Sequence, residues 1–250
     1  MNRKIAVINQ KGGVGKTTTT ANLGYMMARK GYKVTLIDLD PQSSLTVSLG
    51  VDWQEAEGIE DILLHDVDLE TVAVQCQTNL RLVPSGNNLA QMEHLTSNSS
   101  DVAKKLRNLL DHMQDDYVFI DCPPSSGFLI VSALYATKEV LIPIAADYLT
   151  LHGLSHLMGT LISFEERLGH VIKKWFVVTR YHPRRRLSNE VKDKLIEYFP
   201  GKILKTSIRE SSSLAEAPGQ GMTVYEYKKS SNGSYDYQNL AEDLCLERTL

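Results

Sequence analysis

Short runs of apolar residues alternate along the chain with longer segments in which apolar residues recur at helical spacing. The short runs are rich in β-branched side chains, which is typical of strands that are covered on both faces of a sheet. The predicted strands cover residues 5–9, 33–38, 80–84, 117–121, 139–144, 175–179 and 202–208. The predicted helices cover residues 17–30, 100–113, 128–137, 153–168, 188–199 and 237–246.

This alternation predicts an α/β fold, a doubly wound and mostly parallel sheet flanked by helices, with ligands at the carboxyl ends of its strands. Gly31 directly follows the first predicted helix, where a C-cap glycine is expected to end it. The chain has 250 residues, a length that one α/β domain commonly reaches. We therefore expect a single domain over residues 1–250 and no separate N-terminal DNA-binding domain.

A glycine-rich segment, Lys11-Gly12-Gly13-Val14-Gly15-Lys16-Thr17-Thr18, lies between the first predicted strand and the first predicted helix. This order builds a phosphate-binding loop, because glycines can adopt positive φ and let backbone N–H groups converge on an anion. Lys16 is expected to contact the β- and γ-phosphates, and the Thr17 hydroxyl to bind Mg²⁺. The usual spacing would place a glycine at position 10, where this chain has Gln10, and a second lysine, Lys11, follows it.

Aspartates follow two of the predicted strands. Asp38 and Asp40 are two residues apart at the end of the second strand, so their side chains should point to the same side, and Pro41 ends the strand. Asp121 ends the strand over residues 117–121. A carboxylate there would lie near Mg²⁺, usually with water between them, because Mg²⁺ gives up its hydration reluctantly. The sequence thus predicts a site for a nucleoside triphosphate with Mg²⁺.

The segment from Gln10 to Thr18 resembles the deviant Walker A box of the ParA/MinD family of ATPases, which are P-loop NTPases. The resemblance implies that Lys11 reaches the phosphates held by the other subunit of an ATP-bound dimer. It also implies that Asp40 positions the attacking water and that Asp38 supports the magnesium shell. The expected catalytic residues are Lys11, Lys16 and Asp40; the expected phosphate-binding residues are Gly12, Gly13, Val14, Gly15, Lys16, Thr17 and Thr18; the expected metal-binding residues are Thr17, Asp38 and Asp121.

Later segments carry the same resemblance. Residues 121–125 resemble switch II of the family, and residues 142–154 resemble its strand-to-helix stretch, with Asp147 in the place of the usual glutamate. Residues 178–181 resemble the loop that packs on adenine, and residues 213–218 match the family's L-A-E-A-P near the base and the subunit interface. The adenine contacts implied by the resemblance are Thr179, Arg180 and Pro218. Upstream the family usually has I-P-R-N, where this chain has I-R-E-S.

The distribution of charge suggests a polyanionic partner, although the net charge is only −3. Residues 173–205 contain ten Lys and Arg against three acids, and such a basic face is consistent either with nucleic acid or with a solvated surface. The resemblance favours nucleic acid, because it implies an ATP-bound homodimer that binds DNA non-specifically. It also implies a ParB-like partner that stimulates a slow ATP hydrolysis and is bound to the cargo, such as a plasmid or a chromosome. The candidate DNA-binding residues are Arg184, Arg185, Arg186, Lys192 and Lys194.

The cysteines bear on the compartment, and two other classes remain to be weighed. Cys76, Cys122 and Cys245 are odd in number and widely spaced, which argues against disulfides or a zinc site and predicts a cytoplasmic protein. The resemblance implies that this protein is associated with the nucleoid. A MinD-like membrane ATPase needs a basic amphipathic tail, but residues 240–248 contain three acids and one base. Small-molecule ligases of the dethiobiotin synthetase or cobyrinate amidase type share the phosphate loop and would not need Lys11.

Overall fold

The structure, a computed structural model, describes residues 2–52, 57–92, 99–125 and 127–250. These residues form a seven-stranded sheet in the order β3-β4-β2-β5-β1-β6-β7. The strands are β1 Arg3–Val7, β2 Val34–Asp38, β3 Val74–Gln77, β4 Leu80–Val83, β5 Tyr117–Asp121, β6 Glu139–Ala145 and β7 Lys173–Thr179. Every neighbouring pair is parallel except β3 with β4, so the predicted doubly wound, mostly parallel sheet is confirmed.

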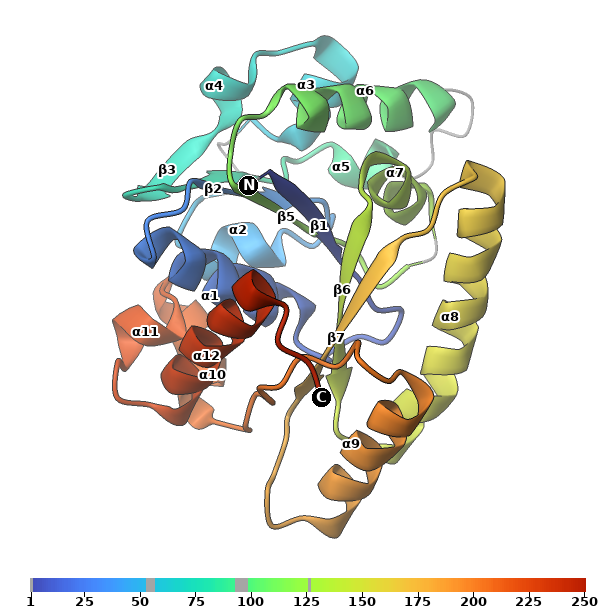
Figure 1. Ribbon diagram of the computed structural model, residues 1–250. Helices are drawn as coiled ribbons and strands as arrows, with labels where there is room; N and C mark the ends of the chain where they lie inside the picture. The colour runs from blue at the N-terminus through green and yellow to red at the C-terminus, as the bar shows by residue number, and fades with distance from the viewer. Residues whose placement is uncertain (1, 53–56, 93–98, 126) are drawn as a thin grey trace.

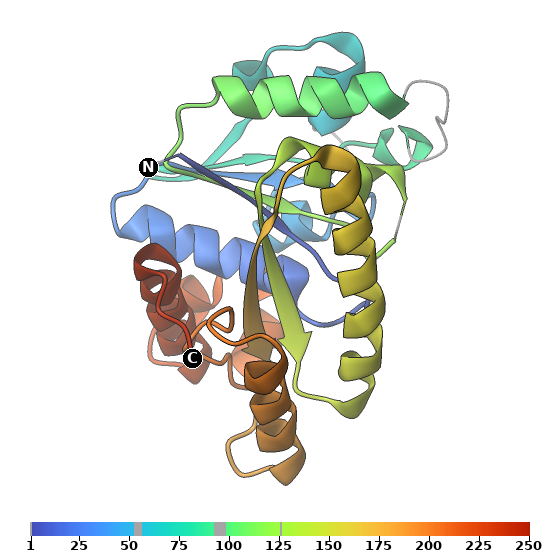
Figure 2. The same cartoon turned by 45° about the vertical axis from the view of Figure 1, so that its right-hand side comes forward.

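Helices cover both faces of the sheet (Figures 1 and 2). The helices packed against one face include α1, α2, α11 and α12, and those on the other include α3, α6, α7, α8 and α9. The helices are α1 Lys16–Arg29, α2 Ser44–Ser48, α3 Ile59–His65, α4 Leu69–Val72, α5 Leu89–Met92, α6 Ser99–His112, α7 Phe128–Ala136, α8 Tyr148–Leu168, α9 Arg186–Tyr198, α10 Ser212–Glu216, the 3₁₀ helix η1 Ala217–Gln220, α11 Val224–Tyr227 and α12 Asn232–Leu246.

The strand predicted over residues 202–208 is wrong. This segment runs beside β7 and forms only isolated bridges, such as that between Phe176 and Ile203. At Thr206 the pairing is interrupted, because its backbone N–H and hydroxyl both donate hydrogen bonds to Asp243 of α12 at 2.7 and 2.5 Å. The segment bonds to β7 again at Ile208, whose N–H donates to the Val178 carbonyl at 2.8 Å. The antiparallel edge strand β3 was not predicted, because its four residues carry no strong apolar pattern.

Most predicted helix boundaries agree with the structure within two residues, but α8 and α12 each begin five residues earlier than predicted. The Ser231 hydroxyl caps α12 by accepting a hydrogen bond from the Ser234 N–H, so the polar residues before Tyr237 form its first turn. Gly31, with φ of 93°, follows the end of α1 as expected. The loops that follow β1, β2 and β5 meet at one edge of the sheet, because Val7 and Asp38 both lie in register with Asp121.

Candidate nucleotide-binding site

The loop between β1 and α1 has the backbone that binding a phosphate requires. Gly13 and Gly15 have φ of 72° and 90°, a region in which a side chain would strain the backbone. Gly15 is the N-cap of α1, and no side chain among the described residues caps the first turn of this helix. Its first N–H groups are therefore available to an anion, and the helix dipole favours negative charge at the same place.

A cavity of about 690 Å³ opens beside this loop. Its walls come from the phosphate loop, the loop after β2, the end of β7 and the segment from Ile208 to Ala215. Thr179 at the end of β7 donates a hydrogen bond from its hydroxyl to the Val14 carbonyl at 2.8 Å, which ties the loop to the sheet. Arg180 extends over the loop, since a Cβ added to Gly13 would lie 3.6 Å from its Nη2. The cavity can hold a nucleotide with its phosphates on the loop.

Lys16, Thr17 and Asp121 are brought together at the first turn of α1. The Thr17 hydroxyl donates to Asp121 Oδ2 at 2.7 Å, and the Thr20 hydroxyl donates to Oδ1 at 3.2 Å. Asp121 is fully buried. Burial and, next, the charge of Asp38 raise the pKa of Asp121, while the Thr17 hydrogen bond and Lys16 oppose this shift. Burial lowers the pKa of Lys16, and the charges of Asp121 and Asp40 partly offset that effect.

Asp38, the last residue of β2, and Asp40, two residues later, have different surroundings. Their spacing predicted that both side chains would face the site. Asp40 lines the cavity. Asp38 is fully buried behind it and accepts hydrogen bonds from the backbone N–H and the hydroxyl of Thr46 at 2.9 and 2.7 Å. Burial also raises the pKa of Asp38, and the Thr46 hydrogen bonds oppose the shift. Asp38 therefore supports the loop that carries Asp40, and it faces Asp121 across the neighbouring strands.

The oxygen groups at the base of the cavity fit a magnesium ion. They are a threonine hydroxyl and carboxylates, which are the donors that Mg²⁺ prefers. The charge of Asp38 disfavours ionisation of Asp121, so a divalent cation beside Thr17 would offset this repulsion. Among the described residues no group of three or more His, Cys, Asp or Glu could hold a metal by itself. Mg²⁺ usually keeps several waters and takes phosphate oxygens of the substrate as further ligands.

Lys11 is in the phosphate loop but is not among the described residues that line the cavity. Its Nζ lies 2.6 and 2.7 Å from the two carboxylate oxygens of Asp147, just beyond β6. Lys11 is expected to act on the phosphates of the other subunit, and in this chain it lies apart from the cavity that Lys16 and Asp40 line. The ammonium group of Lys11 thus faces the β6–α8 side of the loop.

The residues that line the cavity also include Ile208, Leu214, Ala215 and Tyr237. Pro218, expected from the resemblance to contact the base, lies in η1 and is not among the lining residues. Tyr237 is not among the expected site residues; it is buried, and its hydroxyl lies 3.1 Å from the Thr19 hydroxyl.

The segment that carries Ile208 is held in place by α12. Arg209 donates hydrogen bonds to Asp236 from its backbone N–H at 2.9 Å and from its guanidinium at 2.6 to 3.1 Å. Asp236 is buried, whereas Arg209 is partly exposed. Arg209 therefore positions the wall of the cavity at residues 208–211, where this chain has I-R-E-S and the family usually has I-P-R-N.

The predicted DNA-binding residues lie on and before α9, beyond the end of β7 (Figure 1). Arg184, Arg185, Arg186 and Lys194 are exposed, and Arg186 is 93% exposed. Lys192 is partly buried with its Nζ 5.4 Å from the centre of the Tyr181 ring. Lys174, one of the basic residues counted over residues 173–205, has a structural role: it is buried and forms an ion pair with Glu165 at 2.5 Å. The basic surface is therefore narrower than the residue count suggested.

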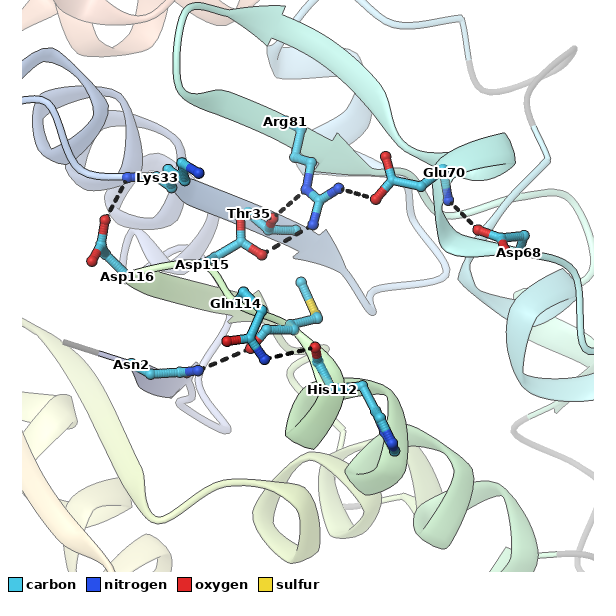
Figure 3. A network of polar contacts seen from close by, with 11 residues as sticks. Asn2, Lys33, Thr35, Asp68, Glu70, Arg81, His112, Gln114, Asp115 and Asp116 are labelled. Carbon is cyan, nitrogen blue, oxygen red and sulfur yellow. Dashed lines mark hydrogen bonds and ion pairs between the residues drawn. The ribbon is translucent and has the colours of Figure 1, made fainter.

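A second cavity of about 690 Å³ lies at the opposite edge of the sheet, around Arg81 (Figure 3). Arg81 donates hydrogen bonds to the Thr35 hydroxyl at 2.8 Å, to Glu70 at 2.6 Å and to Asp115 at 3.0 Å. Asp116 accepts a hydrogen bond from the Lys33 backbone N–H at 2.9 Å. These groups pair with one another and connect β2, β4 and α4, so their role is structural. We therefore place the functional site in the first cavity, at the carboxyl ends of the strands.

The chain is similar to known proteins over most of its length. A protein-family model described as an AAA domain matches residues 2–174. The sporulation initiation inhibitor protein Soj of Bacillus subtilis is 36% identical over 98% of this chain and 99% of its own length. The chromosome-partitioning ATPase Soj of Thermus thermophilus is 35% identical over 97% and 95%.

Solved structures show the same fold. The structure of cobyrinic acid a,c-diamide synthase from Mycobacterium smegmatis with bound ADP and magnesium has a TM-score of 0.80 at 28% identity, covering 98% of this chain and 94% of that one. Apo McdA from Cyanothece has a TM-score of 0.83 at 25% identity, covering 97% of this chain and 99% of that one.

Among the described helices, none has both the length and the apolar character that crossing a lipid bilayer needs.

Proposed function

The chain belongs to the ParA/MinD family of ATPases, and we propose that it is a ParA-type partitioning ATPase. In this proposal it binds ATP with Mg²⁺, forms an ATP-bound homodimer and binds DNA non-specifically, which places it on the nucleoid. A ParB-like partner bound to a cargo then stimulates a slow hydrolysis. The observation that carries the proposal is the orientation of Lys11, a phosphate-loop lysine whose ammonium group is directed away from the cavity of its own chain.

The residues of the site have distinct tasks in hydrolysis. Phosphoryl transfer depends mainly on positioning and on neutralising charge. The loop N–H groups of residues 12–15 and the Lys16 ammonium bind the β- and γ-phosphate oxygens. Thr17, with Asp121 beside it, would hold Mg²⁺, which would supply further positive charge for these oxygens. Asp40, which lines the cavity beside the loop, orients the attacking water.

Lys11 is the residue that would tie this chemistry to self-association. A single protomer has Lys16 at its phosphates but lacks the second ammonium group, since Lys11 lies outside the cavity. Two ATP-bound protomers that face each other would each supply Lys11 to the phosphates of the other. Hydrolysis would then require the dimer and depend on protein concentration, and loss of the γ-phosphate would release the protomers.

The exposed arginines before and at the start of α9 support binding to DNA. Arg184, Arg185 and Arg186 lie in consecutive positions and are exposed. A dimer doubles this set of positive charges, which suits contacts with several phosphates of a duplex and carries no sequence specificity. The ion pair of Arg186 with Glu190 is exposed and would exchange readily for a phosphate.

The proposal is tested with the Asp40→Ala variant, which should bind ATP and hydrolyse it very slowly. Its mass in solution is measured by light scattering with and without Mg²⁺ and ATP. We expect a monomer without ATP and a dimer with it, and no dimer when Lys11→Ala is added to the same variant. The same mass in both conditions would refute the proposed function.

A ligase acting on a small carboxylate is the second candidate, because the diamide synthase structure has the same fold at 28% identity. Such an enzyme would complete its site within one protomer and would not use Lys11. Steady-state ATP turnover of Lys11→Ala distinguishes the two functions. Turnover equal to that of the wild type, with a carboxylate substrate present, would favour the ligase.

A further inference from the structure

The contact between Lys11 and Asp147 is a close ion pair at the mouth of the phosphate loop. Both carboxylate oxygens of Asp147 are within 2.7 Å of the Lys11 Nζ. The two side chains are 34% and 42% exposed, so water and other anions can reach them. The ammonium group of Lys11 therefore already has an anionic partner within its own chain.

Neighbouring contacts hold the backbone of this part of the loop in the same direction. The Asn9 amide donates to the Pro143 carbonyl of β6 at 2.8 Å, and the Lys11 backbone N–H donates to Asn9 Oδ1 at 3.0 Å. The side chain of Gln10 lies 2.9 Å from Nδ1 of His156 on α8. Residues 9–11 are thus fastened to the β6–α8 side, whereas residues 12–18 line the cavity.

We propose that Asp147 is a positioning residue that holds Lys11 within its own protomer and must release it before an ATP-bound dimer can form. The proposal rests on the proposed function, in which Lys11 contacts the phosphates of the partner subunit. One ammonium group then has two competing anionic partners, the Asp147 carboxylate in the same chain and the phosphate oxygens of the other chain. Asp147 thereby sets the protein concentration at which ATP brings two protomers together.

The size of the effect follows from the exposure of the pair. An exposed ion pair changes an equilibrium by up to about five-fold. Two such pairs are broken when a dimer forms, one in each protomer, so removing them should tighten the dimer by up to about 25-fold. The pair is weak enough to be broken by binding to triphosphate, whose charge is larger than that of one carboxylate.

The experiment uses the full chain with Asp40→Ala, so that ATP is not consumed, and measures the dimer dissociation constant by analytical ultracentrifugation with Mg²⁺ and ATP. We expect Asp147→Asn to lower this constant by about 10- to 25-fold, and Asp147→Glu, which keeps the carboxylate, to leave it near that of the parent. Glu242→Gln on α12 is the control, because it removes one negative charge and breaks ion pairs of similar exposure with Lys30 and Arg248, away from the phosphate loop. It should leave the constant unchanged.

Lys11→Ala separates the two proposals. If Lys11→Ala alone dimerises like the parent, the proposed function fails. If Lys11→Ala abolishes the dimer but Asp147→Asn dimerises no better than the parent, only the role of Asp147 fails. A gain from Asp147→Asn that persists in the Lys11→Ala background would also refute it, because the effect would not pass through Lys11. The melting temperature of the nucleotide-free Asp147→Asn monomer should stay within about 4 °C of its parent.

Discussion

Substitution of Glu139 by Gln should destabilise the protein at the edge of the sheet opposite the nucleotide site. Glu139 accepts hydrogen bonds from Arg3 Nε at 3.0 Å, from Arg3 Nη2 at 2.5 Å and from the Trp175 indole N–H at 2.9 Å. Arg3 and Glu139 are 7% and 17% exposed, and Arg3 also donates to the Leu244 carbonyl of α12 at 2.8 Å. The pair joins β1, β6 and β7 to α12.

The expected loss follows from leaving the Arg3 guanidinium buried without a carboxylate. Removing one partner of a buried ion pair lowers the free energy of unfolding by about 3–5 kcal/mol. Glutamine keeps one oxygen that can accept a hydrogen bond, so we expect about 3 kcal/mol. In a chain of this size 1 kcal/mol shifts the melting temperature by about 2–4 °C, which gives a decrease of about 6–12 °C.

The loss should also depend on pH. Burial raises the pKa of Glu139, but the hydrogen bonds from Arg3 and Trp175 and the Arg3 charge outweigh burial and hold the pKa below its usual value of 4.5. A group whose pKa is lower in the folded state contributes its stability above the unfolded pKa and loses it as the pH falls through the folded pKa. The difference between wild type and Glu139→Gln should therefore be largest above about pH 5 and shrink in more acidic solution.

Urea unfolding monitored by circular dichroism measures both the loss of stability and its pH dependence. The measurement is made at neutral pH and then at lower pH values, as far as the protein stays native. Glu190→Gln is the control, because it removes the same charge from an exposed ion pair and should change the free energy of unfolding by less than about 0.5 kcal/mol. A loss below 1 kcal/mol for Glu139→Gln, or a loss that does not change with pH, would refute this account of the pair.

Two further predictions concern the proposed ligands. Thr179→Val removes the hydrogen bond to the Val14 carbonyl, worth about 1 kcal/mol, and should weaken ATP binding about five-fold by titration calorimetry; unchanged affinity would mean that the bond does not position the loop. Replacing Arg184, Arg185 and Arg186 with Ala removes six positive charges from a dimer and should reduce the slope of log affinity against log salt by up to about five in filter binding to duplex DNA. A slope equal to that of the wild type would place the DNA surface elsewhere.

The phosphate loop was predictable because its chemistry is local in the sequence. The run from Lys11 to Thr18 needs only a strand before it and a helix after it, and the periodic pattern predicted both. Asp121 was placed correctly beside Thr17 for a similar reason, since parallel strands bring their carboxyl ends to one edge. The sheet itself followed from the alternation of apolar runs with helical segments.

Contacts between distant segments could not be derived in this way. The spacing of Asp38 and Asp40 predicted one shared direction, but the packing of α2 placed Thr46 against Asp38 and left Asp40 to the cavity. The segment after Gly201 is apolar enough for a strand, yet the hydrogen bonds of Thr206 with Asp243 interrupt its pairing with β7, which resumes at Ile208.

The sequence by itself determined the fold class, the phosphate loop and its lysines, because each depends on residues that are close together in the chain. Only the tertiary structure decided which groups those lysines meet. Asp147 is 136 residues from Lys11 and Thr179 is 165 residues from Val14, and no local pattern encodes either contact. Such pairs form because the sheet order places β6 beside β1 and β7 beside β6, and side-chain packing then selects the partners.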